Sequence, residues 1–193
     1  MKIDPKFVAK VAGTLTIISL ITAALLGLVD GVTRGPISEI EAEKTRVAMS
    51  AVAPAGSEFT DKLDIPAEAI EAAAAQGGKV MELYGVKAGG YVMKISASGS
   101  QGTIVMMVGT DANNAITGIS VVSHAETSGI GTKVVGNELN DAGVPVLDQF
   151  IGLSGSGSLV VKKNIVPITT ATVSTKGITT GANAALAAVE AMG

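Results

Sequence analysis

Residues 11–29 constrain this chain more than any other stretch. They form a run of 19 residues without a charge, VAGTLTIISLITAALLGLV, between Lys10 and Asp30. At about 1.5 Å per residue such a helix spans roughly 28 Å, close to the ~30 Å hydrocarbon core of a bilayer. Its Ser and Thr hydroxyls can bond to the helix backbone, so lipid tolerates them. The alternative is a cleaved signal peptide, whose apolar core is about 7–15 residues; we expect a single transmembrane helix instead.

The charges that flank this span favour one orientation. Lys2, Lys6 and Lys10 precede it, whereas the basic residues that follow it are mixed with glutamates. Acidic residues count for little in the positive-inside rule, so the glutamates do not cancel the basic residues after the span, and the excess of lysine before it is small. The shortness of the N-terminal tail also favours a cytoplasmic N-terminus. We therefore expect residues 1–10 to be a cytoplasmic tail of a single-pass protein of the cell (inner or plasma) membrane. The C-terminal domain is then extracytoplasmic.

The composition excludes several kinds of chemistry. A formal net charge of −3 gives no electrostatic reason to bind nucleic acid, and 3% aromatic residues offer no stacking platform for bases. Without cysteine the chain has no disulfide, no thiolate nucleophile and no Cys-ligated iron–sulfur cluster. Its single histidine, His124, cannot form a two-His metal motif. We expect no metal site and no nucleic-acid partner, and any redox work needs another cofactor.

Beyond the span, the patterns predict an α+β domain with an antiparallel sheet and flanking helices. Residues 30–78 read as a juxtamembrane helical segment, with one helix that starts at Pro36 and a second, after Pro66, that stops at Gly77-Gly78. From residue 79 to 193 we expect the folded domain, because short β-prone runs are separated there by Gly, Asn and Asp. The expected strands are 79–86, 90–99, 103–111, 115–126 and 159–166, and a helix over 177–192 closes the chain.

Two regions carry candidate chemistry. The first is HAETSGIGTK, residues 124–133, whose glycines let a flat or anionic ligand approach the backbone and whose hydroxyls can bind it. A loop of this kind is more often structural than functional. Likewise, a lone histidine is more often a hydrogen-bonded edge residue than a catalyst, and Glu126 either orients a ligand or is solvated.

The second region is PITTATVSTKGITTGANAAL, residues 167–186, which is rich in threonine at the start of the last helix. Hydroxyls and free backbone N–H groups at a helix N-terminus can hold a phosphate, helped by the helix dipole. The residues alone leave open the alternative of a threonine-rich strand followed by Ser/Thr capping of the helix.

The order and spacing of these pieces resemble the G subunit of the Rnf membrane electron-transport complex, a relative of the C subunit of the sodium-translocating NADH:quinone reductase. The resemblance covers the N-terminal span, GPISEIEAE, HAETSGIGTK, LDQFIGLSG and the threonine segment. It implies an extracytoplasmic FMN-binding domain on one transmembrane helix. The function it implies is that of an electron-carrier subunit in a complex that couples ferredoxin and NAD redox to Na⁺ or H⁺ transport. The implied partners are the other subunits and a flavin transferase that uses FAD.

In that family a threonine hydroxyl is esterified to the phosphate of FMN. The family's motif is Asp, two residues, Ser or Thr, Gly, Ala, Thr, one residue, then Ser or Thr. Laid on VPITTATVS, residues 166–174, it nominates Thr172 as the attachment residue. Val166 and Thr170 depart from it, because the family has Asp and Gly there. A similar string at 180–183 ends in Asn183, which has no hydroxyl to esterify.

The resemblance also implies the remaining residues of the flavin site. The loop 126–130 would line the isoalloxazine, and Lys162 or Lys163 could offset the phosphate charge. The chain shows no catalytic constellation and no NAD fingerprint of its own. The alternative, supported by Val166 and Thr170, is a membrane-anchored structural or binding module with non-covalent flavin or none. Besides Thr172, the expected cofactor-binding residues are Glu126, Thr127, Gly129, Ile130, Thr169, Ala171, Ser174 and Thr175.

Overall fold

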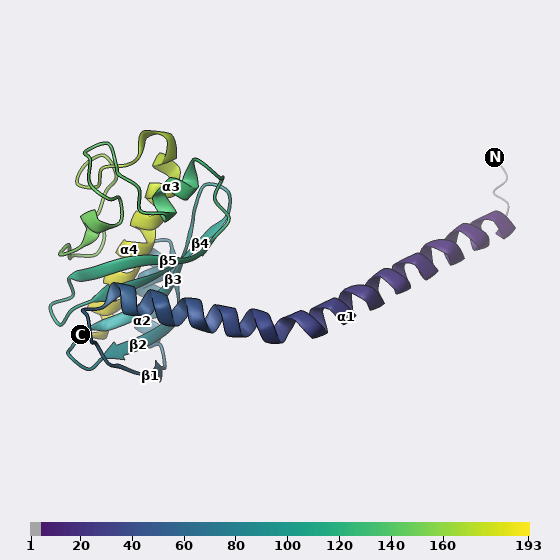
Figure 1. Ribbon diagram of the computed structural model, residues 1–193, viewed down its shortest axis with the longest axis horizontal. Helices are drawn as coiled ribbons and strands as arrows, with labels where there is room; N and C mark the ends of the chain where they lie inside the picture. The colour runs from purple at the N-terminus through teal and green to yellow at the C-terminus, as the bar shows by residue number, and fades with distance from the viewer. Residues whose placement is uncertain (1–4) are drawn as a thin grey trace. The chain divides into compact units, whose positions relative to one another are not determined.

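The computed structural model describes residues 5–193, which divide between Glu43 and Lys44 into two compact units. Helix α1, Pro5–Val52, makes up the first unit and contributes its last turns to the second (Figure 1). Its side chains from Val11 to Val29 are all exposed. By length and composition α1 is long and apolar enough to cross a membrane, and the expected span of residues 11–29 lies within it.

The expectation that a new helix starts at Pro36 is wrong, because α1 continues through this proline. A proline inside a helix removes one backbone hydrogen bond, here the bond to the carbonyl of Val32. Val32 and Pro36 are both exposed. Solvent can therefore take the place of the missing donor, which lowers the cost of keeping the helix continuous.

The second unit is built on a five-stranded antiparallel sheet with strand order β1-β2-β3-β4-β5, which confirms the expected α+β class. Strand β1 was not expected, because FTDKL is mostly polar and nearly all exposed. Since the unit begins at Lys44, both β1 and helix α2 (Ala67–Ala75) pack with the sheet, although they lie within residues 30–78. The strands are β1 Phe59–Leu63, β2 Gly78–Val86, β3 Tyr91–Ser98, β4 Thr103–Thr110 and β5 Ile116–His124.

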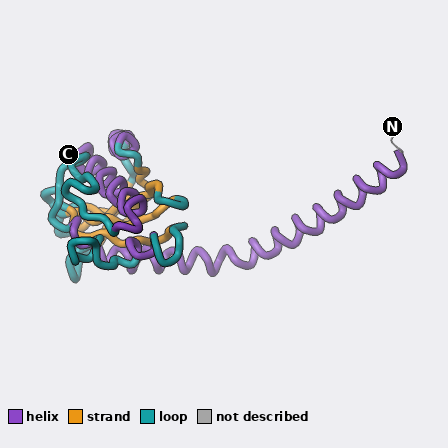
Figure 2. The backbone as a smooth tube through the Cα atoms, turned by 90° about the horizontal axis from the view of Figure 1, so that it is seen from above, coloured by secondary structure: helices purple, strands orange, loops and turns teal. Residues whose placement is uncertain are grey.

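Both faces of the sheet are covered. Alternate residues of β3 and β4, such as Met93 and Met106, belong to the main core beneath α2 and α4 (Thr172–Met192). Their neighbours Val92 and Met107 face the last turns of α1 instead. Figures 1 and 2 show helices on both sides of the strands. The sheet is thus a central layer with both faces covered. A site is therefore to be sought in the loops that join the edge of the sheet to α4.

Helix α4 begins at Thr172, five residues before the expected start at residue 177. The hydroxyls of Thr175 and Thr179 donate to the carbonyls four residues earlier, at 3.1 and 2.8 Å, so these threonines are satisfied within a helix. A short 3-10 turn, Thr169–Ala171, leads into it. The early start places the threonine segment at the N-terminus of a helix, not on a strand.

The strand expected over 159–166 is wrong. The chain turns back on itself there, with Lys162 at a φ of +68°, and only an isolated bridge joins Val161 to Ile165. The side chain of Asn164 stabilises this turn: its Oδ1 accepts from the Val160 amide at 2.7 Å, and its Nδ2 donates to the Ser158 carbonyl at 3.0 Å. β-Prone composition is overridden by this local side-chain bonding.

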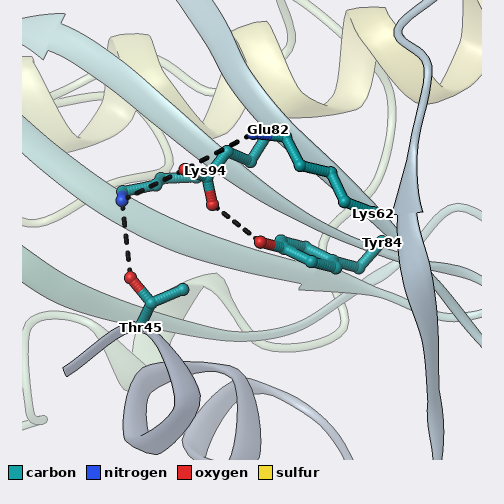
Figure 3. A network of polar contacts seen from close by, with 5 residues as sticks. All are labelled: Thr45, Lys62, Glu82, Tyr84 and Lys94. Carbon is teal, nitrogen blue, oxygen red and sulfur yellow. Dashed lines mark hydrogen bonds and ion pairs between the residues drawn. The ribbon is translucent and has the colours of Figure 1, made fainter. Parts of the chain in front are cut away.

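A polar network on the α1 side of the sheet ties the end of that helix to β2 and β3 (Figure 3). Lys94 donates to Thr45 at 3.4 Å and to Glu82 at 3.5 Å, and Tyr84 donates to Glu82 at 2.8 Å. Lys62 adds an ion pair with Glu82 at 3.7 Å. We call these five residues the Glu82 network.

The Glu82 network shifts the pKa of two of its members. Burial alone would raise the pKa of Glu82, but the hydrogen bond from Tyr84 and the charges of Lys94 and Lys62 outweigh it, so the pKa is lowered. Burial, together with the carboxylate of Glu82, raises the pKa of Tyr84 to about 12. Both shifts favour the protonation states that make the network's bonds.

Candidate functional site

The two regions singled out in the sequence meet at one cavity of about 190 Å³. The loop after β5 forms one wall and the turn that enters α4 forms the other. Seven of the expected cofactor residues line this cavity, whereas Gly129 and Thr175 do not. We call it the loop cavity; its lining residues are Ser100, Glu126, Thr127, Ile130, Gly131, Thr169, Thr170, Ala171, Thr172, Val173 and Ser174.

Glu126 joins three segments beside this cavity. It is only 7% exposed, and its Oε1 accepts from the amides of Ser100 at 2.7 Å and Gln101 at 3.4 Å. Its Oε2 accepts a short hydrogen bond from the hydroxyl of Ser174, which is 1% exposed. The loop, the β3–β4 turn and the first turn of α4 are thereby tied together. The polar atoms of the Glu126 and Ser174 side chains therefore bind within this junction rather than to a ligand.

Gly131 is needed for the Glu126 junction to close. A Cβ added there would overlap Glu126 Oε2 and lie 2.9 Å from Ser174 Oγ, which is too close for either atom. Gly129 has a φ of +75°, and its amide donates to Thr132 Oγ1 at 2.8 Å. This tight turn presents Ile130, 46% exposed, as an aliphatic surface on the loop cavity.

Thr172 stands between the loop cavity and a second, larger one. It is the first residue of α4, is half-buried, and its hydroxyl donates to the Thr169 carbonyl at 3.2 Å. It lines both cavities. The second cavity has a volume of about 380 Å³, within the range typical of small-molecule sites, and we call it the lysine cavity. Its lining residues are Leu159, Val160, Val161, Lys162, Thr172, Lys176, Thr179, Thr180 and Asn183.

The surroundings of Thr172 suit an anion. Lys162 and Lys176 both line the lysine cavity, whereas Lys163 does not. Ala171, at the N-cap of the 21-residue helix α4, supplies no side-chain cap. The N-terminus of α4, where the helix dipole is positive, therefore lies at the end of a cavity that two lysines also line.

Several contributors to the site were not found from the sequence. Lys176 lies within the threonine segment but was given no role there, and Ser100 comes from a hairpin turn with no distinctive pattern. Gly131 was expected to let a ligand approach the backbone, whereas in the structure it makes room for Glu126 and Ser174. His124 accepts from the Glu126 amide through Nδ1 at 3.2 Å, which fits the expected role of a hydrogen-bonded edge residue. Nothing in residue type marked the hairpin turn, because backbone amides are its contribution.

Comparison with known proteins decides the family. Residues 99–187 match the FMN-binding domain family. The G subunit of the Na⁺-translocating ferredoxin:NAD⁺ oxidoreductase complex of Acetobacterium woodii is 31% identical, with 95% of this chain and 92% of that protein covered. The chain belongs to the family of these G subunits. The G subunit of the ion-translocating oxidoreductase complex is 30% identical in Methanosarcina acetivorans, over 79% of this chain and 82% of the relative. In Cereibacter sphaeroides it is 29% identical, over 76% of each.

Membership of the G-subunit family confirms the resemblance seen in the sequence. The chain carries the FMN-binding domain of this family, its relatives are by name subunits of ion-translocating oxidoreductase complexes, and α1 is its candidate membrane anchor. The matched region runs from Gly99 in the β3–β4 turn to Ala187 in α4. It includes Glu126, Thr172 and every residue that lines the two cavities.

Proposed function

We propose that this G subunit carries FMN as a phosphoester on Thr172 and relays electrons within a complex that couples ferredoxin and NAD redox to Na⁺ or H⁺ transport. The observation that carries the proposal is the position of the Thr172 hydroxyl. It lies at the first residue of α4 and on the border of both cavities, one of which two lysines also line. No other hydroxyl of the threonine segment combines these features within the described residues.

Three of the neighbouring hydroxyls are engaged elsewhere. Ser174 donates to Glu126, and Thr175 donates to the Ala171 carbonyl from a fully buried position. Thr169 donates to Asp141 at 2.5 Å. Thr170 precedes the helix and lines the loop cavity but not the lysine cavity. Thr172, with its longer bond of 3.2 Å, is therefore the hydroxyl best placed to accept a phosphoryl group.

The attachment balances as a transfer from FAD. The Thr172 oxygen attacks the phosphorus of the FMN half of FAD, and the bond from that phosphorus to the bridging oxygen breaks. AMP leaves with that oxygen, and the hydroxyl proton passes to a base. As the family resemblance implies, we expect a separate flavin transferase to bind FAD.

The residues present fit the group. Ile130 and Thr127 offer an aliphatic surface and a hydroxyl to a flat ring at the loop cavity. Lys162, Lys176 and the first amides of α4 would offset the charge of the phosphodiester. When bound, FMN supplies reversible storage of one or two electrons. The Glu126 junction holds the two walls of the loop cavity in place, so the protein fixes where that chemistry happens.

The same proposal includes the topology. Lysines precede the apolar span, which favours a cytoplasmic N-terminus, a single pass and a domain outside the cytoplasm. A covalent link would keep the flavin on the protein in a compartment where free FMN is too scarce to rebind.

The test is the mass of the full-length protein purified from its own membranes, with peptide mapping of residues 163–176. We expect an addition of one FMN less one water on the peptide that holds Thr172. Thr172→Ala should abolish it, Thr172→Ser should retain it at a lower level, and Thr103→Ala, an exposed hydroxyl on β4, should leave it unchanged.

A second candidate function is a module with non-covalent flavin or none, favoured by Val166 and Thr170 at the motif's Asp and Gly positions. An unmodified mass with yellow FMN released on denaturation would contradict the covalent link but keep the electron carrier. A colourless, unmodified protein would support the structural module and overturn the proposal.

A further inference from the structure

The turn that precedes Thr172 is held by side chains from a distant segment. Asp141 accepts two hydrogen bonds from Thr169: one from its amide at 3.1 Å and one from its hydroxyl at 2.5 Å. The Asp141 amide in turn donates to the Pro167 carbonyl at 3.2 Å. Gln149 binds both the amide and the carbonyl of Val166, at 2.8 and 3.0 Å. The segment 141–149 therefore holds residues 166–169 at both ends, Val166 through Gln149 and Thr169 through Asp141.

Asp141 projects from a rigid turn. The side chain of Asn140, buried to 6% exposure, accepts from the amides of Ala142 at 3.0 Å and Val144 at 3.1 Å. The Asn140 amide also donates to the Val144 carbonyl at 2.8 Å. Although the Asp141 side chain is exposed, its backbone is therefore well fixed, and the carboxylate acts from a defined position.

These contacts connect Asp141 to the hydroxyl proposed to carry the flavin. Asp141 fixes Thr169, and the Thr169 carbonyl accepts the hydrogen bond of Thr172 Oγ1 at 3.2 Å. We propose that Asp141 is a positioning residue that orients the Thr172 hydroxyl for transfer of FMN. The proposal rests on Thr172 being the attachment residue.

The inference also gives the valine at position 166 a structural context. An aspartate at position 166 would lie three residues before Thr169, within local reach of the same amide and hydroxyl. This chain has valine there, and the carboxylate reaches those two donors from Asp141. The same donors are thus served from another part of the sequence.

The experiment measures the initial rate at which the full-length, unmodified protein acquires covalent FMN from FAD and a flavin transferase. Flavin fluorescence in denaturing gels and intact mass give the rate. We expect Asp141→Ala to slow it by about tenfold or more, since misplacing a reacting group by a fraction of an ångström is costly. Adding Val166→Asp to Asp141→Ala should restore most of the rate. Asp148→Ala is the matched control, because it removes an exposed carboxylate that, among the residues the structure describes, is hydrogen-bonded to Asn137 alone.

A second readout does not depend on the flavin. Amide hydrogen exchange over residues 166–173, measured before flavinylation, should speed up in Asp141→Ala and return toward the original rate in the double variant. An unchanged rate of FMN attachment in Asp141→Ala would overturn the inference, and so would a loss that Val166→Asp does not restore. If the original protein itself never acquires FMN on Thr172, the proposed function fails instead, so the two failures are distinguishable.

Discussion

Glu126 and Glu82 have similar structural roles, but the groups that bind their carboxylates differ in charge. Each ties together segments that are far apart in the sequence. Glu126 accepts from two amides and a buried serine hydroxyl, all neutral donors. Glu82 accepts from Tyr84 and pairs with two lysines, so its charge is offset. Breaking the first arrangement leaves buried donors without an acceptor, which is costly. In the second, lysines offset the charge of Glu82, and its pKa is lowered.

The largest expected effect is that of Glu126→Ala. It leaves the buried Ser174 hydroxyl and two backbone amides without their acceptor, so we expect a loss of about 3 kcal/mol in the free energy of unfolding. Urea unfolding of the full-length protein in detergent measures it. Glu138→Ala, at an exposed position, should change the stability by less than about 0.5 kcal/mol. Equal effects of the two variants would show that the junction contributes nothing special.

Gly131→Ala should disrupt the same junction without removing a polar atom. The added methyl would overlap Glu126 Oε2 and Ser174 Oγ, so the loop has to move away from α4. We expect a loss of about 2 kcal/mol, typical of overpacking, in the same unfolding experiment. Combined with Glu126→Ala, the two losses should be clearly less than additive, because both break one contact. Additive losses would count against a shared origin.

Glu82→Gln should cost less, about 1–2 kcal/mol near neutral pH, because Lys94 is 15% exposed and loses its counter-charge. The effect depends on pH in a defined direction. Since the folded pKa of Glu82 is lowered, its stabilisation is fully present above its ordinary value of 4.5 and is lost as the pH falls through the folded pKa. The stability curve of Glu82→Gln should therefore be flatter on the acid side. A variant with an acid limb as steep as the original would contradict this reading.

Tyr84→Phe should have the smallest effect at neutral pH, about 1 kcal/mol for one hydrogen bond. Its signature lies on the alkaline side. Because the folded pKa of Tyr84 is raised to about 12, its contribution is fully present below the ordinary value of 10.0 and is lost as the pH rises through about 12. Tyr84→Phe should remove this alkaline component, measured by unfolding at several pH values. Absorbance titration of the tyrosinate band in the original protein checks the pKa independently.

The sheet was largely predictable, and the reasons are local. Short β-prone runs between turn residues identified four strands, and the turn between β4 and β5 is closed by Asp111, whose Oδ1 accepts from two amides. Strand β1 was not predicted because it is formed by pairing with β2, while its own mostly polar and exposed residues show no strand pattern. The strand expected at 159–166 failed because Asn164 folds that segment into a turn.

The candidate site likewise has a part that could be predicted from the sequence and a part that could not. The threonine segment and the glycine-rich loop could be singled out from their residues, and a resemblance could nominate Thr172. That Ser174 and Glu126 bind each other could not be foreseen, because their contact joins residues 48 positions apart. The same holds for Asp141, which reaches Thr169 across 28 positions.

The sequence by itself determined the apolar span, the α+β class and the family, because each rests on local composition or on the order of motifs along the chain. The tertiary structure alone decided which hydroxyls remain available and which are engaged within the protein. It also decided that Lys162 and Lys176, rather than Lys163, line a cavity together with Thr172. The physical reason is that a hydroxyl's reactivity and a lysine's usefulness depend on what folding brings next to them.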